Sequence, residues 1–261
     1  MKQLIKKLIA YDTIYTSLKD SFFYQSYKKY RAQIANYLYN NPSKDFFIIG
    51  ITGTNGKTTT VNLLHKILND NVGSTVAIST ATIKIGNEEL KNEKKMTSLD
   101  VFDLQQLLAT AKEKGCKIAV LEVSSQGLDQ SRFEGIKFDF AVLTNITMDH
   151  LDYHGTMEQY AEAKKKLFKY VLANGKENKY CAISVDDRYG KTWFESMAFD
   201  KKVSFSLQSS SVLKATKIEE HLEGTYFEFS YLGQKFAGTT QLVGDYNISN
   251  ILGALAVSTE I

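Results

Sequence analysis

The sequence predicts an α/β fold of the phosphate-loop (P-loop) type. We expect a mostly parallel sheet with helices on both faces and a small antiparallel β section, preceded by a short helical N-terminal segment. Three observations support this prediction. Strand-like and helix-like runs alternate from residue 46 onward. A glycine-rich loop followed by Lys-Thr separates the first strand from the first helix. Period-two runs, such as the one at residues 225–229, interrupt the alternation within residues 211–243.

The elements follow from short apolar runs and from helix-like periodicity, taken in chain order. The expected strands are residues 46–52, 75–80, 117–123, 138–144, 180–185 and 202–206. The expected helices are residues 57–69, 100–114, 157–172, 188–197 and 246–258. The last helical pattern runs to Ile261 without a Gly or Pro stop signal, so we expect a truncated chain. Residues 46–261 are therefore predicted to form one domain.

Residues 1–45 differ in charge from the rest of the chain. They carry eight Lys or Arg and three Asp, a balance of +5 in a protein with a net charge of +3. Seven of the 15 tyrosines lie here, and apolar residues recur at three- and four-residue steps. No run approaches the ~20 apolar residues of a membrane-spanning helix. Two interpretations remain open: a basic amphipathic leader on an anionic membrane surface, or a helical hairpin packed on the main domain.

Composition narrows the function classes. Hydrophobic residues make up 43% of the 261 residues, which is ample for a packed core. The net charge of +3 is too small to indicate nucleic-acid binding. The two cysteines, Cys116 and Cys181, have no metal-ligand spacing. We expect a reduced, cytoplasmic setting.

The loop after the first strand has the chemistry of a phosphate-binding loop. Glycines let backbone N–H groups surround phosphate oxygens at a helix N-terminus. Lys57 can reach the outer phosphates, and the Thr58 hydroxyl can hold Mg²⁺. The strict G-x-x-x-x-G-K-[ST] pattern fails because its first glycine falls on Ile51. The alternative is a plain glycine turn between strand and helix. We expect nucleoside triphosphate binding by Gly53, Thr54, Asn55, Gly56, Lys57, Thr58 and Thr59.

Ordered motifs in four regions of the chain carry a resemblance to a known family. The loop G-T-N-G-K-T-T-T resembles the ATP site of the Mur ligases and of the related folylpolyglutamate synthases, which usually carry Gly-Ser after the lysine. Residues 122–128 read E-V-S-S-Q-G-L, similar to E-V-S-S-H-G-L in the Mur ligases that add the third residue of the stem peptide, the MurE type. Residues 145–155 (N-I-T-M-D-H-L-D-Y-H-G), 160–168 (Y-A-E-A-K-K-K-L-F) and 244–250 (G-D-Y-N-I-S-N) continue the resemblance, which covers residues 46–261.

Three further residues are candidate metal ligands. Glu122 ends an apolar strand, where a carboxylate can hold Mg²⁺; the alternative is an ordinary ion pair. The resemblance implies that His150 binds a second Mg²⁺. By sequence alone, Lys164–Lys166 form a solvated helix face. The resemblance instead implies that Lys164 is carbamylated, which would give it the negative charge that a metal site needs. The implied catalytic set is Lys57, Glu122, His150 and Lys164. The implied metal ligands are Thr58, Glu122, His150 and Lys164.

The resemblance also implies where the substrates lie. The muramoyl end would rest on Thr97, Ser98, Ser124, Ser125, Gln130 and Arg132. The family's T-T-P becomes Thr97-Ser98-Leu99 here, and its S-S-H ends in Gln126. Asn247 and Asn250 would contact the nucleotide, although Asn247 also fits a helix N-cap. The family's separate uridine-binding domain cannot fit within 45 residues, which is the main departure.

The resemblance implies an ATP- and Mg²⁺-dependent amide ligase of peptidoglycan synthesis. The γ-phosphate passes to a muramoyl-peptide carboxylate, and an amine then displaces phosphate from the acyl phosphate. The C-terminal ligase domain of the family would lie beyond residue 261, so we expect this chain to bind ATP and Mg²⁺ but to ligate poorly. Alternatives are a folylpolyglutamate-synthase-like ligase, a subunit of a lipid-linked amidotransferase whose zinc-ribbon cysteines are missing here, and a catalytically silent ATP-binding partner.

Overall fold

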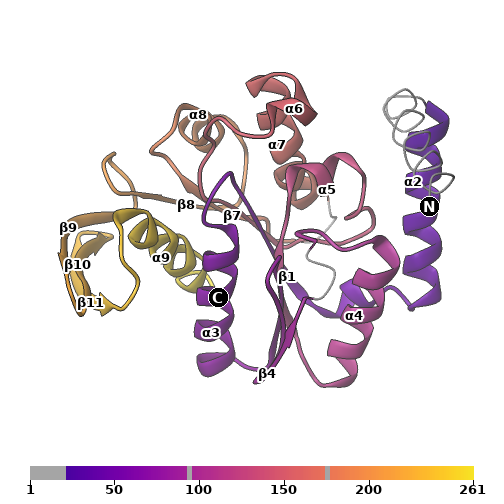
Figure 1. Ribbon diagram of the computed structural model, residues 1–261, viewed down its shortest axis with the longest axis horizontal. Helices are drawn as coiled ribbons and strands as arrows, with labels where there is room; N and C mark the ends of the chain where they lie inside the picture. Colours follow the sequence, from indigo (N-terminus) through magenta and orange to yellow (C-terminus); the bar gives the residue numbers. More distant parts are fainter. Residues whose placement is uncertain (1–21, 93–95, 174–176) are drawn as a thin grey trace, which may run out of the picture.

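The protein forms a three-layer α/β structure around one long twisted sheet (Figure 1). The computed structural model describes residues 22–92, 96–173 and 177–261. The sheet has 11 strands in the order β11-β10-β9-β8-β7-β6-β1-β5-β2-β3-β4. The parallel strands are β1 (Phe47–Thr52), β2 (Thr75–Ile78), β5 (Ile118–Glu122), β6 (Phe140–Leu143), β7 (Tyr180–Ser184) and β8 (Lys201–Ser206). This confirms the predicted mostly parallel sheet.

Strand β1 lies at the centre of the sheet, where the strand order reverses. It pairs in parallel with β5 on one side, Ile51 opposite Glu122, and with β6 on the other, Thr52 opposite Leu143. The chain that leaves β1 passes β5 to reach β2, whereas the chain that leaves the neighbouring β6 goes to β7 on the other side, so these two connections run in opposite directions across the sheet. Ligands of open α/β sheets bind in the crevice that such a reversal opens beyond the carboxyl ends of the strands. The loop after β1 lies at that point.

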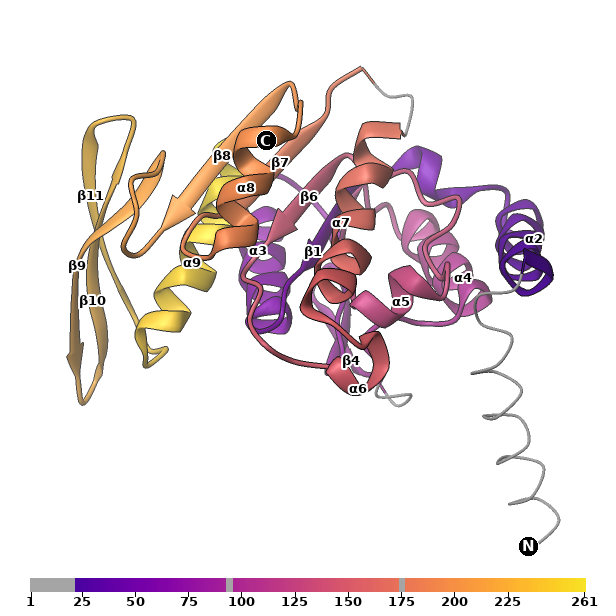
Figure 2. The ribbon, with the colours of Figure 1, turned by 90° about the horizontal axis from the view of Figure 1, so that it is seen from above.

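Helices cover both faces of the sheet and divide the core in two (Figure 2). Helices α3 (Lys57–Asn71) and α9 (Asp245–Ser258) pack on one face. The other face holds α4 (Val101–Glu113), α5 (Ser125–Asp129), α7 (Met157–Ala173) and α8 (Arg188–Ser196). Ile48 and Ile49 show why the sheet needs both layers, since these neighbours point into opposite cores and are both fully buried.

Antiparallel strands flank the parallel core at both ends. Strands β9 (Leu213–His221), β10 (Gly224–Tyr231) and β11 (Gln234–Thr240) form the antiparallel section predicted for residues 211–243. The hairpin of β3 (Thr82–Ile85) and β4 (Glu88–Lys91) was not predicted. Its strands are only four residues long. All four residues of β4 are exposed, and β4 lacks the apolar alternation by which a strand is recognised in a sequence.

The first described helix, α2 (Phe22–Leu38), packs beside α4 at the edge of the domain (Figures 1 and 2). Ala32 and Ala35 are buried against Val101. The short 3₁₀ helix Pro42–Asp45 then leads into β1. Residues 22–45 therefore pack on the main domain through one α-helix and one 3₁₀ helix. The predicted leader or hairpin also involves residues 1–21, which lie outside the described residues. No described helix combines the length and the apolar character needed to span a bilayer.

The predicted boundaries agree with the structure to within two residues for the main helices and parallel strands. Two short helices were missed, α5 and α6 (Leu151–His154). Both are shorter than two turns and follow loop-like sequence, so no helical period can be detected. Ser125 of α5 and Lys57 nevertheless line one cavity, and the His154 ring of α6 lies 3.0 Å from the Ser125 hydroxyl.

Candidate active site

The loop between β1 and α3 has the backbone shape of a phosphate-binding loop. Gly53 and Gly56 adopt φ angles of 152° and 84°. Other groups approach both glycines closely, because an added Cβ would lie 1.8 Å from the Thr144 hydroxyl at Gly53 and 2.0 Å from Asn250 Oδ1 at Gly56. The glycines are thus required for conformation and for space. Thr144 and Asn250 hold the loop from two other elements.

Lys57 and Lys164 meet at one backbone oxygen of this loop. Lys57 Nζ donates to the carbonyls of Gly53 (3.1 Å) and Thr54 (2.8 Å), and Lys164 Nζ donates to the same Gly53 carbonyl (2.7 Å). Lys164 is 1% exposed, and its ammonium lies 4.3 Å from the centre of the Tyr160 ring. Burial, followed by the nearby charge of Lys57, places the pKa of Lys164 well below its usual range, against a smaller opposite effect of Asp149. The predicted solvated helix face is therefore wrong for Lys164.

The pKa of Lys57 is also lowered, but less than that of Lys164. Burial lowers its pKa, and the carboxylates of Glu122 and Asp149 partly offset that effect. The two lysine side chains thus direct their Nζ atoms at one carbonyl of the loop, and Lys57 brings positive charge to it. Such an arrangement favours an anionic ligand.

Thr58 and Glu122 come together as a pair of oxygen ligands. The Thr58 hydroxyl donates to Glu122 Oε2 (2.9 Å). Glu122 is 3% exposed, and its other hydrogen bonds come from the N–H (2.7 Å) and hydroxyl (3.0 Å) of Thr80. All these donors are neutral, and no ion pair to Glu122 occurs among the described residues. The ordinary ion pair considered above is therefore wrong here. A buried carboxylate surrounded by neutral donors suits a divalent cation.

His150 borders the same space but does not complete a metal site by itself. Its backbone is left-handed (φ 51°), and its ring lies 6.1 Å from that of Tyr160 and 3.6 Å from Asp149 Oδ2. Nowhere in the described ranges do three His, Cys, Asp or Glu side chains converge as metal ligands. Any second metal would therefore also need phosphate oxygens or a modified Lys164.

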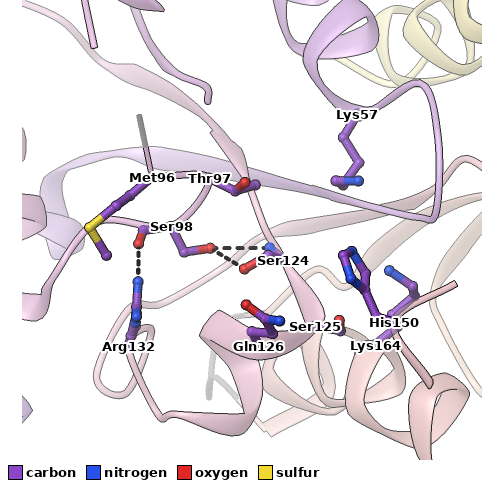
Figure 3. Close-up of a pocket in the computed structure, with 10 residues that line it drawn as sticks. All are labelled: Lys57, Met96, Thr97, Ser98, Ser124, Ser125, Gln126, Arg132, His150 and Lys164. Carbon is purple, nitrogen blue, oxygen red and sulfur yellow. Dashed lines mark hydrogen bonds between the residues drawn. The ribbon is translucent and has the colours of Figure 1, made fainter. Parts of the chain in front are cut away.

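A polar cavity of about 290 Å³ opens beside Lys57 (Figure 3). Of the residues predicted for the muramoyl end, Thr97, Ser98, Ser124, Ser125 and Arg132 line it together with His150 and Lys164. Ser98 connects the cavity wall: its hydroxyl lies 2.8 Å from that of Ser124, and its carbonyl accepts from Arg132 Nη1 (2.5 Å). The structure thus brings the predicted acceptor and phosphate groups to one cavity.

Gln130 is placed differently from its predicted neighbours. It does not line the cavity, and its Oε1 accepts from Arg132 Nε (2.9 Å) and Nη2 (2.6 Å). The guanidinium is therefore held from behind by Gln130 while it reaches Ser98. Gln130 orients Arg132 in this arrangement.

A second, larger cavity of about 750 Å³ lies on the other side of the loop. Asn55, Gly56, Thr59 and Asn250 line it, with Asp186 after β7 and Tyr246 at the start of α9. Asn247 is buried behind Asn250, and its amide donates to the Val243 carbonyl (2.7 Å). The N-cap of α9 is Gly244, so the alternative that Asn247 caps this helix is wrong. The phosphate loop separates the two cavities.

Three residues of the site were not assigned from sequence. The Thr80 hydroxyl lies 3.0 Å from Glu122 Oε1 and 3.0 Å from the Thr97 hydroxyl, so Thr80 connects Glu122 to Thr97. Tyr160 is fully buried beneath Lys164 and bonds the Thr54 hydroxyl (3.2 Å). Met96 lines the smaller cavity. Thr80 and Met96 lie in loops without a motif, so only the fold could show them, whereas Tyr160 lies within a segment already singled out.

The fold and this site define an α/β protein of the phosphate-loop class, with two cavities on either side of the loop. Comparison with known proteins narrows the class. Residues 51–258 match the Mur ligase middle domain. The chain is 36% identical over 225 residues to "UDP-N-acetylmuramyl-tripeptide synthetase 2" of Oceanobacillus iheyensis, covering 86% of this chain and 45% of that protein. It is 38% identical over 232 residues to the "UDP-N-acetylmuramoyl-L-alanyl-D-glutamate--2,6-diaminopimelate ligase" of Lactiplantibacillus plantarum, covering 87% and 46%.

A solved structure supports the same family relationship. The structure of a UDP-N-acetylmuramoyl-L-alanyl-D-glutamate--2,6-diaminopimelate ligase superimposes with a TM-score of 0.76 at 28% identity, covering 89% of this chain and 48% of that one. The chain belongs to the Mur ligase family, over the middle domain of that family. It spans about half the length of the curated relatives it matches.

Proposed function

We propose that this chain is the ATP-binding middle domain of a MurE-type, ATP-dependent amide ligase of peptidoglycan synthesis. The observation that carries the proposal is the meeting of Lys57, Thr58, Glu122 and Lys164 around one glycine loop between two cavities. ATP would lie with its base and ribose in the larger cavity, beside Asn250, and its γ-phosphate near Lys57. The acceptor carboxylate would approach that phosphate from the smaller cavity.

The chemistry needs positioning and neutralisation of charge more than covalent catalysis. Lys57 would bind the outer phosphate oxygens, leaving the loop carbonyls it contacts in the free chain. Thr58 and Glu122 fit Mg²⁺, which supplies further neutralisation of phosphate charge when it is bound. Arg132, held by Gln130 and Ser98, would orient an anionic group of the acceptor. These roles agree with transfer of the γ-phosphate to a carboxylate, followed by attack of an amine on the resulting acyl phosphate.

Carbamylation of Lys164 is part of the same proposal. The neutral Lys164 amine would form an N–C bond to carbon dioxide and release one proton to solvent, which leaves a carbamate; the lowered pKa of Lys164 favours the neutral amine. A free ammonium beside Lys57 would repel a metal ion, whereas a carbamate would attract it. The burial of Lys164 also excludes water from the modified group. His150 and this carbamate, which line the same cavity, would hold the second cation.

The relatives supply the substrate class. Their names specify a uridine-linked muramoyl dipeptide as acceptor and, in several cases, 2,6-diaminopimelate as the amine. We propose that the acceptor of this chain is a muramoyl peptide. The amine would be added to it in the cytoplasm, where ATP is available. The intact set of Lys57, Glu122, His150 and Lys164 argues against a catalytically silent partner module. Thr58-Thr59 after the lysine argues against a folylpolyglutamate-synthase-like ligase.

We also propose peripheral contact with an anionic membrane through the N-terminal segment. Helix α2 leaves an exposed stripe of Tyr27, Tyr30, Ile34, Tyr37 and Leu38, and residues 1–45 carry a charge of +5. Aromatic side chains and basic residues on one segment are the features of an interfacial anchor.

Loss of nucleotide binding on Lys57→Ala tests the central proposal. One ammonium offsets several phosphate charges, so we expect the affinity for ATP·Mg²⁺ in calorimetry to fall at least tenfold. Lys66→Ala is the matched control, because Lys66 lies on the same helix and its side chain is 79% exposed. Equal affinity of Lys57→Ala and the unaltered chain would contradict the loop assignment.

A further inference from the structure

Helix α2 contacts the two loops that form the acceptor cavity, although no described residue of α2 lines that cavity. The first contact is an ion pair. Arg31 Nη2 lies 3.2 Å and 3.0 Å from the two carboxylate oxygens of Asp100. Asp100 caps α4 by accepting from the Phe102 N–H (3.2 Å), and it lies two residues after Ser98. Arg31 therefore holds the end of the loop that carries Thr97 and Ser98.

The second contact reaches the loop that carries Arg132. The Asn36 amide donates to the Glu134 carbonyl (3.3 Å), and the Ser43 hydroxyl to the Gly135 carbonyl (3.4 Å). The approach is close, because a Cβ at Gly135 would lie 2.0 Å from Asn36 Nδ2. This loop is thus held at a point three residues beyond Arg132. Gly135 is the residue that allows the helix to come so near.

Charge connects the N-terminal half of α2 to the same region. Burial by itself raises the pKa of Asp129, but the hydrogen bond and charge of Lys166, the Tyr153 hydroxyl and the charge of Lys28 together bring it below its usual range. Lys28 belongs to α2 and is 8% exposed. Asp129 ends α5 and directly precedes Gln130.

Between these contacts, α2 packs so tightly on α4 that a shift of one helix would move the other. Ala32 and Ala35 are 1% and 0% exposed and lie against Val101, and the Arg31 guanidinium lies 5.5 Å from the centre of the Phe102 ring. Small side chains allow the backbone of α2 to approach α4 closely. Figure 2 shows α2 alongside α4, with α5 on the inner side.

We infer that α2 is a positioning element of the acceptor site, and that the Arg31–Asp100 pair sets the distance between the Ser98 loop and the Arg132 loop. Inside the cavity these loops meet where Arg132 Nη1 bonds the Ser98 carbonyl (Figure 3). Outside the cavity, α2 joins them a second time. The inference rests on the proposed function, since it assumes that this cavity receives the acceptor. It assigns the residues of α2 a role in acceptor affinity and none in nucleotide affinity.

The test measures two affinities of the full chain by calorimetry. The acceptor probe is UDP-N-acetylmuramoyl-L-alanyl-D-glutamate, with a non-hydrolysable ATP analogue and Mg²⁺ present; the second ligand is ATP·Mg²⁺ alone. Arg31→Met keeps the aliphatic stem and removes the charge, and we expect acceptor affinity to fall about two- to fivefold with nucleotide affinity unchanged. Arg31→Lys should retain acceptor affinity, because a single nitrogen of Arg31 makes both contacts with Asp100.

Asp100→Asn supplies an independent arm, because Asn also caps helices and only the charge is lost. It should weaken acceptor binding as Arg31→Met does, and the double variant should be no weaker than either single variant. Lys112→Met is the matched control. It removes the Lys112–Asp45 pair (2.7 Å), which has similar exposure but joins the far end of α4 to residues 42–45.

Three outcomes would overturn the inference, and they are distinguishable. Unaltered acceptor affinity in Arg31→Met would show that α2 does not position the loops. Equal weakening by Arg31→Met and Lys112→Met would show general loosening of α4. No acceptor binding by the unaltered chain, with nucleotide binding intact, would overturn the proposed acceptor and the inference together.

Discussion

Lys164, Lys165 and Lys166 are chemically identical, and only burial distinguishes them. Lys164 is 1% exposed, whereas the side chains of Lys165 and Lys166 are 25% and 41% exposed and pair with Glu162 and Asp129. Helix geometry turns each successive residue by 100°, so only one of the three can face the phosphate loop. Residue chemistry at this site is therefore decided by position on α7.

We expect Lys164→Ala to lose Mg²⁺-dependent activity in a full-length ligase by at least tenfold, with acetate restoring part of it. A small carboxylate can enter the space left by the carbamate and supply the missing negative charge. Lys165→Ala and Lys166→Ala are the controls. Three equally mild variants would refute the assignment, and ¹³C NMR with labelled bicarbonate would detect the carbamate directly.

The ligand-free chain should become more stable as pH rises toward 10.5 because of Lys164. Its pKa is lowered on folding, so the unfolded state binds more protons between the lowered value and 10.5. One proton corresponds to a slope of about 1.4 kcal/mol per pH unit in the free energy of unfolding. Denaturant unfolding of Lys164→Met under CO₂-free conditions should lack this part of the slope. An unchanged slope would mean that Lys164 titrates normally.

Gly56 and Gly115 allow conformation to be separated from space. Their φ angles are 84° and 85°, but an added Cβ meets Asn250 Oδ1 at Gly56 and nothing within 4 Å at Gly115. We expect Gly115→Ala to cost about 1–2 kcal/mol of stability without changing ATP affinity. Gly56→Ala should also displace Asn250 and weaken ATP binding. Calorimetry and thermal unfolding of both variants would test this, and equal ATP affinities would contradict it.

At the scale of elements, α2 shows two faces with different partners. Arg31, Ala32, Ala35 and Asn36 contact the domain, whereas the stripe of Tyr27, Tyr30, Ile34, Tyr37 and Leu38 is exposed. The periodicity within residues 1–45 predicted a helical segment, but it could not tell which face of α2 would be covered. Both interpretations of the N-terminal segment therefore survive for different faces of one helix.

We expect the double variant Tyr30→Ser, Tyr37→Ser to bind anionic vesicles less than the unaltered chain does. These side chains are 68% and 79% exposed, so the loss of apolar contact with lipid should outweigh any effect on folding. Co-sedimentation at low and high salt would measure it, since the basic contribution is screened. Leu232→Ser, an exposed residue between β10 and β11, is the control. Equal sedimentation of all three proteins would contradict membrane contact.

At the scale of the whole molecule, the loop after β1 joins both layers of the core. Asn250 reaches Gly56 from α9 on one face, and Lys164 reaches Gly53 from α7 on the other. Thr144 after β6 bonds the Asn55 carbonyl (2.6 Å). Because these elements belong to both core clusters, a ligand in the loop is coupled to the stability of the entire domain.

ATP·Mg²⁺ should therefore raise the unfolding temperature of the whole chain in a single transition. At a concentration 100 times the dissociation constant, the gain is about 2.7 kcal/mol. Differential scanning calorimetry would measure it, with Lys57→Ala as the variant expected to show no shift. A shift of equal size in that variant would place the nucleotide elsewhere.

The sequence by itself determined the alternating α/β order, the phosphate loop and the family. These depend on local patterns: apolar runs, helical periods, and glycines followed by Lys57 and Thr58. It also identified most of the cavity residues, through short motifs along the chain that resemble those of a known family. The sequence did not predict the short elements α5, α6, β3 and β4, because four or five residues are too few to show a helix or strand period.

Only the tertiary structure decided how these groups act. The contacts of Thr80 with Glu122, of the buried Lys164 with Gly53 and of Arg31 with Asp100 all join residues from different parts of the chain. Burial, pKa and orientation depend on the groups that folding brings near, and those groups are distant in sequence. The sequence therefore determined which chemical groups this protein has, and packing decided which of them meet at the loop after β1.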